Sequence, residues 1–231
     1  MALRALSLCA GIGGLDLAAE RVLGSRTVCF VERDPFCARL LSRRFPGALI
    51  WDDLLTFDAR PWRGVVDLVL AGAPCQPFST ASRVRRVALD LLPHVLAVVH
   101  EVEPLAVFLE NVPGARDSFH RIREELLALG YESPPILKTS TADLGAAHDR
   151  RRIWLLAYAH GHGERLRAVH AEVAGIRPPL PPAWEADGPS RELLRVDDGI
   201  PDRMDRLRAL GNAVVPAQAT DALCTLLEGI A

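Results

Sequence analysis

The 231-residue sequence lacks several features, and each absence removes a class of protein. No apolar run reaches the ~18 residues that a membrane span needs, so we expect no membrane partner. The first residues do not read as a signal peptide, because their apolar run passes straight into a glycine-rich turn. These two absences predict a cytoplasmic protein.

Paired cysteines are also missing. The five cysteines are scattered and none stands in CxxC spacing, which favours neither a zinc site nor a disulfide framework. His160, His162 and His170 have no accompanying cysteine or carboxylate pattern, so we expect no metal. Four cysteines are expected to be core residues: Cys9, Cys29, Cys37 and Cys224.

Lysine is almost absent, and the net charge is only −2. That charge argues against a protein that coats nucleic acid through bulk charge. Lys138 is the only lysine among 27 basic residues. A GC-rich genome would account for the arginine total, but the clustering indicates bidentate contacts to phosphates or base edges. The clusters are Arg83, Arg85 and Arg86; Arg150, Arg151 and Arg152; and Arg203, Arg206 and Arg208.

Short apolar segments alternate with helical ones along most of the chain. Strands are expected within residues 3–14, 27–34, 47–53, 65–72, 105–112 and 153–159. Helices are expected within residues 15–24, 35–45, 89–102 and 119–130, and at the C-terminal end. This alternation predicts an α/β fold with a doubly wound, mostly parallel sheet.

The alternation breaks in the last third of the chain. Residues 160–200 are rich in Pro, Gly, Arg and His, which predicts a small, irregular appended subdomain rather than a core layer. Regular patterning then returns. We therefore divide the chain into a main domain over 1–159, the irregular region over 160–200, and a C-terminal segment over 201–231 whose helix returns to the main domain.

Three glycines, Gly11, Gly13 and Gly14, separate the first strand from the first helix. Glycine permits positive φ and close backbone approach to a ligand, and the following helix N-terminus favours a negative group. Glu32, at the end of the second strand, can accept from both ribose hydroxyls. Asp53, after the third strand, can accept from an adenine amino group. Together they predict a site for an adenosine-containing cofactor.

Cys75 follows the fourth strand, at the edge where doubly wound sheets bind ligands. Pro74 and Pro77 stiffen the turn around it, and Glu110 ends the next strand at the same edge. A nucleophilic thiol beside a proton-donating carboxyl suits addition to an electron-poor ring.

These segments, taken in order, resemble the DNA cytosine-5 methyltransferase family. They are "LCAGIGGLDLA", "VERDPFCARLL", "WDDLLTFD", "GAPCQPFS", "LENVPG", "ADLGAAHDRRRIWLLA" and "RALGNAVVPAQA". They cover nearly all of the chain except residues 160–195. The resemblance implies a Rossmann-like class I methyltransferase fold. It also implies double-stranded DNA as substrate, S-adenosylmethionine as methyl donor and S-adenosylhomocysteine as product.

The resemblance also implies roles for single residues. Cys75 would attack C6 of a flipped-out cytosine, Glu110 would protonate or hydrogen-bond N3, and Arg150 and Arg152 would hold the base or its phosphate. The implied cofactor contacts are Cys9, Ala10, Gly11, Gly13, Gly14, Leu15, Glu32, Arg33, Asp53, Leu54, Pro74, Asn212, Ala213 and Val214. The implied DNA contacts are Gln76, Ser79, Arg83, Arg85, Arg86 and Arg151.

The chain departs from the family pattern at several places. Cys9 stands where phenylalanine is usual, His148 stands where glutamine is common, and the segment 79–90 lacks the usual glycines. The resemblance makes residues 160–200 a target-recognition region, which is much shorter here than is usual in the family. This predicts short or relaxed sequence specificity and suits a phage or mobile element. We expect a monomer, and a restriction endonuclease partner is left open.

Three alternatives remain at this point. The first is a tRNA cytosine-5 methyltransferase, because the same motifs occur in one branch of the family. The second is a catalytically silent cofactor- or DNA-binding module, which would form no covalent adduct. The third is a nicotinamide-dependent reductase sharing the glycine turn, which gives Cys75 and Glu110 no role.

Overall fold

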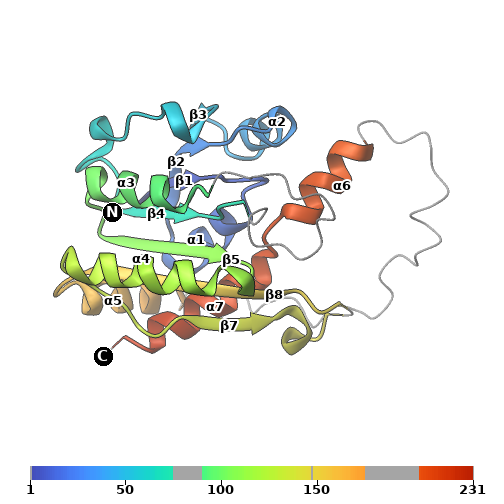
Figure 1. The fold of residues 1–231 in the computed structure, drawn as a ribbon. Coiled ribbons are helices and arrows are strands. Elements are labelled where there is room, and N and C mark those ends of the chain that lie inside the picture. Colours follow the sequence, from blue (N-terminus) through green and yellow to red (C-terminus); the bar gives the residue numbers. More distant parts are fainter. Residues whose placement is uncertain (1, 75–89, 147, 175–202, 231) are drawn as a thin grey trace.

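A central sheet of eight strands organises the chain in the computed structural model, which describes residues 2–74, 90–146, 148–174 and 203–230 (Figure 1). The strands are β1 (Arg4–Leu8), β2 (Arg26–Val31), β3 (Leu49–Trp51), β4 (Leu68–Ala71), β5 (Ala106–Asn111), β6 (Tyr131–Glu132), β7 (Leu137–Ser140) and β8 (Arg151–Ala159). Their order is β3-β2-β1-β4-β5-β8-β6, with β7 also paired to β8. The first five are mutually parallel and β8 is antiparallel to its neighbours. The predicted mostly parallel α/β sheet is confirmed.

Helices cover both faces of the sheet. They are α1 (Gly14–Leu23), α2 (Pro35–Arg44), α3 (Leu92–Val102), α4 (Arg116–Ala128), α5 (Gly163–Ala174), α6 (Arg203–Asn212) and α7 (Pro216–Glu228). Short 3-10 turns are η1 (Leu54–Thr56), η2 (Arg60–Trp62), η3 (Pro113–Ala115) and η4 (Thr141–Leu144). One buried cluster joins α3 and α4 to one face, and the other joins α1, α5 and α7 to the opposite face (Figure 1). No helix within these described ranges has the length and apolarity to cross a bilayer.

Local signals place several element ends where they were predicted. Gly24 ends α1 in the left-handed region at φ 59°, and Asp34 caps the start of α2. Pro93 lies in the first turn of α3, where its missing N–H costs nothing, so it starts the helix rather than kinking it. The helix predicted over 119–130 is α4, which begins earlier and ends at Ala128.

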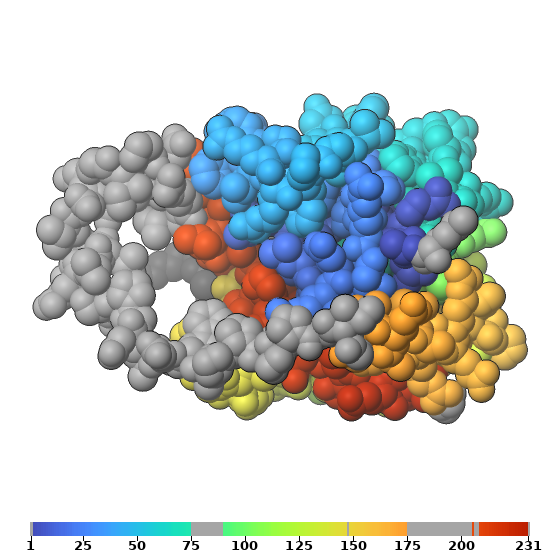
Figure 2. Space-filling view, turned by 180° about the vertical axis from the view of Figure 1, so that it is seen from behind, coloured from blue at the N-terminus to red at the C-terminus, as the bar shows by residue number. Residues whose placement is uncertain are grey.

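The expectation of an irregular stretch over 160–200 is wrong for its first part. Gly163–Ala174 form α5, and Leu166 is fully buried in the cluster that contains α1 and α7. A Cβ on Gly163 would lie 2.7 Å from Ile230 Cγ2, so this end of α5 packs closely on the C-terminal residues. Figure 2 shows α5, in orange, beside the red α7. The domain boundaries themselves stay predictions, and residues 175–200 lie outside the described ranges.

The sequence pattern did not predict two short strands, β6 and β7. β6 and β7 both pair antiparallel with β8, and neither carries a continuous apolar run. Their partner β8 lies between β5 and β6. In the β5–β8 ladder Glu110 stands opposite Trp154. This pairing brings the start of β8 to the end of β5, where the candidate site lies.

A buried carboxyl ties α1 to the sheet. Asp16, in the first turn of α1, is 1% exposed and accepts hydrogen bonds from Ser7 Oγ of β1 at 3.0 Å and Thr27 Oγ1 of β2 at 2.7 Å. Burial raises the pKa of Asp16 from 3.8 to about 6, although both hydroxyls act in the opposite direction. The sequence pattern gave no sign of this residue, because an acid in a first helical turn is ordinarily solvent-exposed.

This raised pKa predicts a pH-dependent contribution to stability. The Asp16 contribution is fully present below pH 3.8 and is lost as the pH rises through about 6, because the unfolded chain then releases its proton more readily. We expect Asp16→Asn to gain about 3 kcal/mol in unfolding free energy relative to wild type between pH 4 and 7. Urea unfolding at several pH values measures this difference. The exposed Asp117→Asn is the matched control, and a difference independent of pH would contradict the prediction.

Candidate functional site

The glycine turn joins β1 to α1 at the carboxyl edge of the sheet. Gly11 has φ 56° and Gly13 has φ 83°, a region that side-chain-bearing residues rarely adopt. Gly13 is the N-cap of α1 and supplies no side-chain cap. A Cβ on Gly14 would lie 2.4 Å from Val214 O, so the backbone of the C-terminal segment packs directly on this turn. The C-terminal segment therefore contacts the glycine turn, while its predicted part in cofactor binding stays a prediction.

Glu32 fixes the glycine turn. Its Oε2 accepts from Gly11 N at 2.6 Å, and its Oε1 accepts from Asp34 N at 2.8 Å. Burial raises the pKa of this carboxyl, while the backbone donors act in the opposite direction. Each carboxylate oxygen retains a further acceptor site, which leaves capacity for hydroxyl donors of a ligand. These hydrogen bonds lie within the protein, so the predicted contact of Glu32 with a ribose stays a prediction.

Asp34 links this turn to the far end of the chain. Its Oδ1 accepts from Phe36 N and Cys37 N and so caps α2, while its Oδ2 pairs with the Arg208 guanidinium of α6 at 2.7 Å. Figure 2 shows the red-orange α6 region against the light-blue region that contains α2. Helix α6 is thereby tied to the residue two positions after Glu32.

Cys9 lies within electrostatic range of both predicted cofactor acids. It has a positive φ of 51° and is half-buried. Burial raises the pKa of its thiol to about 12, and the negative charges of Glu32 and Asp53 add to this effect. The Cys9 thiol is therefore neutral at physiological pH and unsuited to nucleophilic attack. Asp53 itself accepts from Leu55 N at 3.0 Å.

The other predicted cofactor residues differ in exposure. Ala10, Ala213 and Val214 are half-buried, Leu15 and Leu54 are buried, and Arg33, Pro74 and Asn212 are exposed. Of the expected core cysteines, Cys29 and Cys37 are buried. Cys9 and Cys224 are only half-buried and pack against the core.

A buried acid–arginine pair lies at the ends of β5 and β8. Glu110 is 7% exposed, and its Oε1 lies 2.5 Å from Arg152 Nε. The Arg152 Nη1 also donates to Arg151 O at 2.7 Å, which fixes the orientation of the guanidinium. Burial raises the pKa of the Glu110 carboxyl, and the charges of Arg152 and Arg150 oppose this shift. A carboxyl in this setting can retain a proton and donate it.

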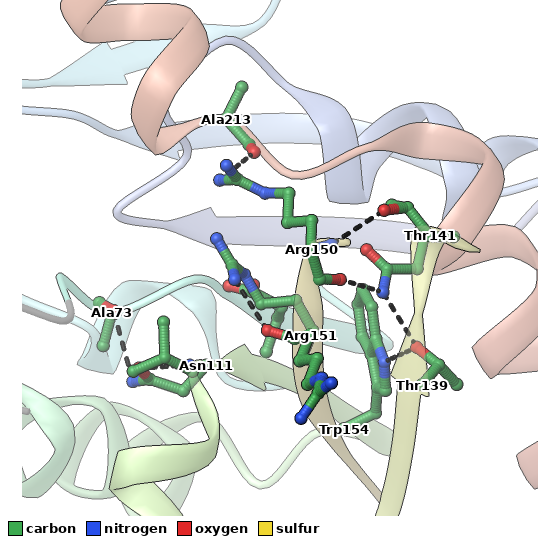
Figure 3. Close-up of polar contacts among 12 residues, drawn as sticks. Ala73, Asn111, Thr139, Thr141, Arg150, Arg151, Trp154 and Ala213 are labelled. Atoms are coloured by element: carbon green, nitrogen blue, oxygen red, sulfur yellow. Dashed lines mark hydrogen bonds and ion pairs between the residues drawn. The ribbon is translucent and has the colours of Figure 1, made fainter. Parts of the chain in front are cut away.

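The same carboxyl lies beside the end of β4. A Cβ on Gly72 would lie 3.6 Å from Glu110 Oε2, so the carboxyl stands over the residue three positions before Cys75. The next residue of β5, Asn111, donates through Nδ2 to Ala73 O at 3.3 Å (Figure 3). Six predicted residues lie outside the described ranges: Cys75, Gln76, Ser79, Arg83, Arg85 and Arg86.

The side chains of Arg150 and Arg151 have different partners from that of Arg152. Arg150 Nη2 donates to Gly211 O at 2.9 Å, in the last turn of α6. It also donates to Ala213 O at 2.8 Å, just after that helix (Figure 3). Arg151 is exposed and pairs with Asp149 at 2.9 Å. Arg152 forms an ion pair with Glu110. The predicted roles of Arg150 on the base and of Arg151 on DNA stay predictions.

A buried amide behind Arg150 was missed from sequence. Gln218 of α7 is fully buried, and its Nε2 donates to Arg150 O at 2.9 Å and to Thr139 Oγ1 at 3.0 Å. Trp154 Nε1 donates to the same hydroxyl at 2.8 Å (Figure 3). A glutamine two residues after a helix-starting proline carries no sequence signal of such a role.

The strand order, with the glycine turn at the switch point of the sheet, defines a doubly wound α/β protein, a class that binds ligands at this edge. Residues 3–179 match the family model of the C-5 cytosine-specific DNA methylases, and the chain belongs to this family.

Individual relatives agree with this assignment. The chain is 33% identical to the type II methyltransferase M.NgoMIV of Neisseria gonorrhoeae over 68% of this chain and 52% of that protein. It is 26% identical to M.CviJI of Paramecium bursaria Chlorella virus IL3A over 99% of this chain and 60% of that protein. A solved structure described as a DNA modification methyltransferase encoded within a prophage (E. coli) superposes with a TM-score of 0.55 at 28% identity, over 68% of this chain and 47% of that one. The chain spans about half the length of these curated relatives.

Proposed function

We propose that this protein is a DNA (cytosine-5-)-methyltransferase that acts on a flipped-out cytosine with S-adenosylmethionine as donor. The observation that carries the proposal is the buried Glu110 carboxyl, paired with Arg152 and standing over Gly72, three residues before Cys75. A proton-donating acid next to a nucleophilic cysteine is the combination that makes a pyrimidine ring reactive at C5. Family membership and the type II methyltransferase relatives support it.

The residues at the glycine turn fit this cofactor. The α1 N-terminus carries backbone N–H groups without a side-chain cap, which suits the carboxylate of the methionine part. Glu32 and Asp53 lie near Cys9 at the ends of β2 and β3, which suits the ribose and adenine parts. When bound, S-adenosylmethionine supplies an electrophilic methyl group.

The chain's own residues divide the remaining chemistry. The Cys75 thiolate adds to C6 while Glu110 donates its proton to N3, so that C5 gains nucleophilic character. After methylation, loss of the C5 proton to a base restores the C5–C6 double bond and expels the thiolate. Arg152 keeps the Glu110 carboxyl in place throughout. Removing the cytosine from the stack exposes C6 and C5 to these groups.

Trapping on DNA that contains 5-fluorocytosine tests the proposal. Fluorine cannot leave C5 as a proton does, so the covalent protein–DNA adduct cannot resolve and survives denaturing electrophoresis. We expect the wild-type protein to form this adduct in the presence of S-adenosylmethionine. Cys75→Ser is expected to form none, and Cys224→Ser, remote from the site on α7, is expected to form it normally.

The same experiment defines failure. A wild-type chain that forms no adduct with duplex DNA and transfers no tritiated methyl group to it contradicts the proposal. An adduct on a tRNA substrate alone assigns the activity to RNA. An adduct that survives Cys75→Ser shows that another residue is the nucleophile.

A further inference from the structure

The Arg150 guanidinium is directed at the C-terminal segment. Its Nη2 donates to Gly211 O at 2.9 Å, in the last turn of α6, and to Ala213 O at 2.8 Å, just after that helix (Figure 3 shows the Ala213 contact). Residues 211–214, the end of α6 and the turn that follows it, are called the 211–214 turn below. Hydrogen bonds from a charged donor are shorter and stronger than neutral ones. Two such bonds from one nitrogen hold both sides of the turn to the start of β8.

The main chain of Arg150 is itself fixed. Arg150 N donates to Thr141 Oγ1 at 2.9 Å, and Arg150 O accepts from the buried Gln218 Nε2 at 2.9 Å. Gln218 belongs to α7, which begins directly after the turn. The backbone of Arg150 is therefore held in place on both sides, so that its side chain can fix the position of the turn.

The turn meets the glycine turn on its other side. A Cβ added to Gly14 would lie only 2.4 Å from Val214 O, so the two backbones are in direct contact. Gly14 is the first residue of α1. A shift of the turn would thus displace the start of α1, where the methionine part of the proposed cofactor would bind.

Arg150 also adjoins the proposed base site. It stands two residues before Arg152, and its charge acts on the Glu110 carboxyl in the same direction as that of Arg152. The Arg150 side chain therefore acts electrostatically on the Glu110 carboxyl and also forms hydrogen bonds to the turn that packs on Gly14.

We propose that Arg150 is a positioning residue for the cofactor: by holding the 211–214 turn against Gly14, it sets cofactor affinity and couples the cofactor site to the base site. The inference rests on the proposed function, because the cofactor is the one assigned there. Coupling between two sites is reciprocal, so cofactor binding in turn changes the affinity for the target base by the same factor. A residue acting only on the target base would leave cofactor affinity unchanged when no DNA is present.

Calorimetric titration of the full chain with S-adenosylhomocysteine, without DNA, tests this difference. We expect Arg150→Met to raise the dissociation constant about tenfold, which corresponds to about 1.4 kcal/mol. Arg150→Lys, which keeps a charged donor on a shorter reach, is expected to restore part of the affinity. Arg121→Met is the matched control, since Arg121 is exposed on α4, on the face of the sheet opposite α7, and its dissociation constant is expected to equal that of wild type.

The outcomes separate the two proposals. If Arg150→Met binds S-adenosylhomocysteine as wild type does while methyl transfer falls, Arg150 acts on the base alone and the inference is wrong. If wild type itself binds no S-adenosylhomocysteine, the proposed function fails. Thermal unfolding checks each variant, and should Arg150→Met fail to fold, wild-type affinity in the folded Arg150→Lys together with an unchanged KM for S-adenosylmethionine would overturn the inference.

Discussion

Glu110→Gln is expected to slow methyl transfer by about 10²- to 10⁴-fold, the usual contribution of a positioned general acid. Glutamine keeps the size of the side chain and an oxygen that can accept from Arg152, but it has no proton to transfer to N3. Initial rates of tritium transfer to duplex DNA at saturating S-adenosylmethionine measure the effect.

The pH dependence gives this prediction a second readout. Because burial raises the pKa of Glu110, wild type keeps the proton to higher pH than an exposed glutamate would, and its rate is expected to fall as the pH rises through that pKa. In Glu110→Gln this alkaline decline is expected to disappear, since no titrating proton remains.

Glu132→Gln is the matched control for this substitution. Glu132 lies on β6, pairs with His160 at 2.7 Å and is remote from the site, so its variant is expected to methylate at the wild-type rate. Equal rates for Glu110→Gln and wild type would rule out proton donation by Glu110.

Gly14→Ala is expected to weaken cofactor binding by more than tenfold and to destabilise the fold by about 1–3 kcal/mol, the usual cost of overpacking. The added Cβ would lie 2.4 Å from Val214 O and 3.1 Å from Val214 Cβ, so one of the two backbones must move. Titration with S-adenosylhomocysteine and thermal unfolding measure the two effects.

A second glycine supplies the control. Gly211 lies in α6 with nothing within 4 Å of an added Cβ, and its carbonyl is retained in Gly211→Ala. This variant is expected to unfold at or above the wild-type temperature, because alanine favours a helix over glycine. Wild-type affinity in Gly14→Ala would show that the contact with Val214 is loosely packed.

The site residues that the sequence predicts best are those at the ends of parallel strands. Glu32 after β2, Asp53 after β3 and Glu110 in β5 share one edge because the carboxyl ends of parallel strands meet there. Alternation of apolar strands and amphipathic helices was enough to place them. For this reason the sequence alone assigns the glycine turn and the three acids to one region of the protein.

What the sequence could not predict depends on side-chain direction. Arg150 and Arg152 stand two apart and look alike in the sequence, yet one holds a turn and the other pairs with Glu110. Asp16 and Gln218 are polar residues whose burial depends on partners far along the chain. Helix α5 was missed because glycine and histidine flank it, although Leu166 and Val169 have helical spacing on its buried side.

The antiparallel ladder between β5 and β8 has a consequence for tolerance to insertions and deletions. Because Glu110 stands opposite Trp154, the removal of residue 151 would send each following side chain of β8 to the other face of the sheet. Trp154 would leave its stack with Phe108, and the guanidinium at 152 would point away from the acid. Length in this strand is therefore under tighter constraint than the identity of most of its residues, and natural length variation is expected to concentrate in the loops on either side of it.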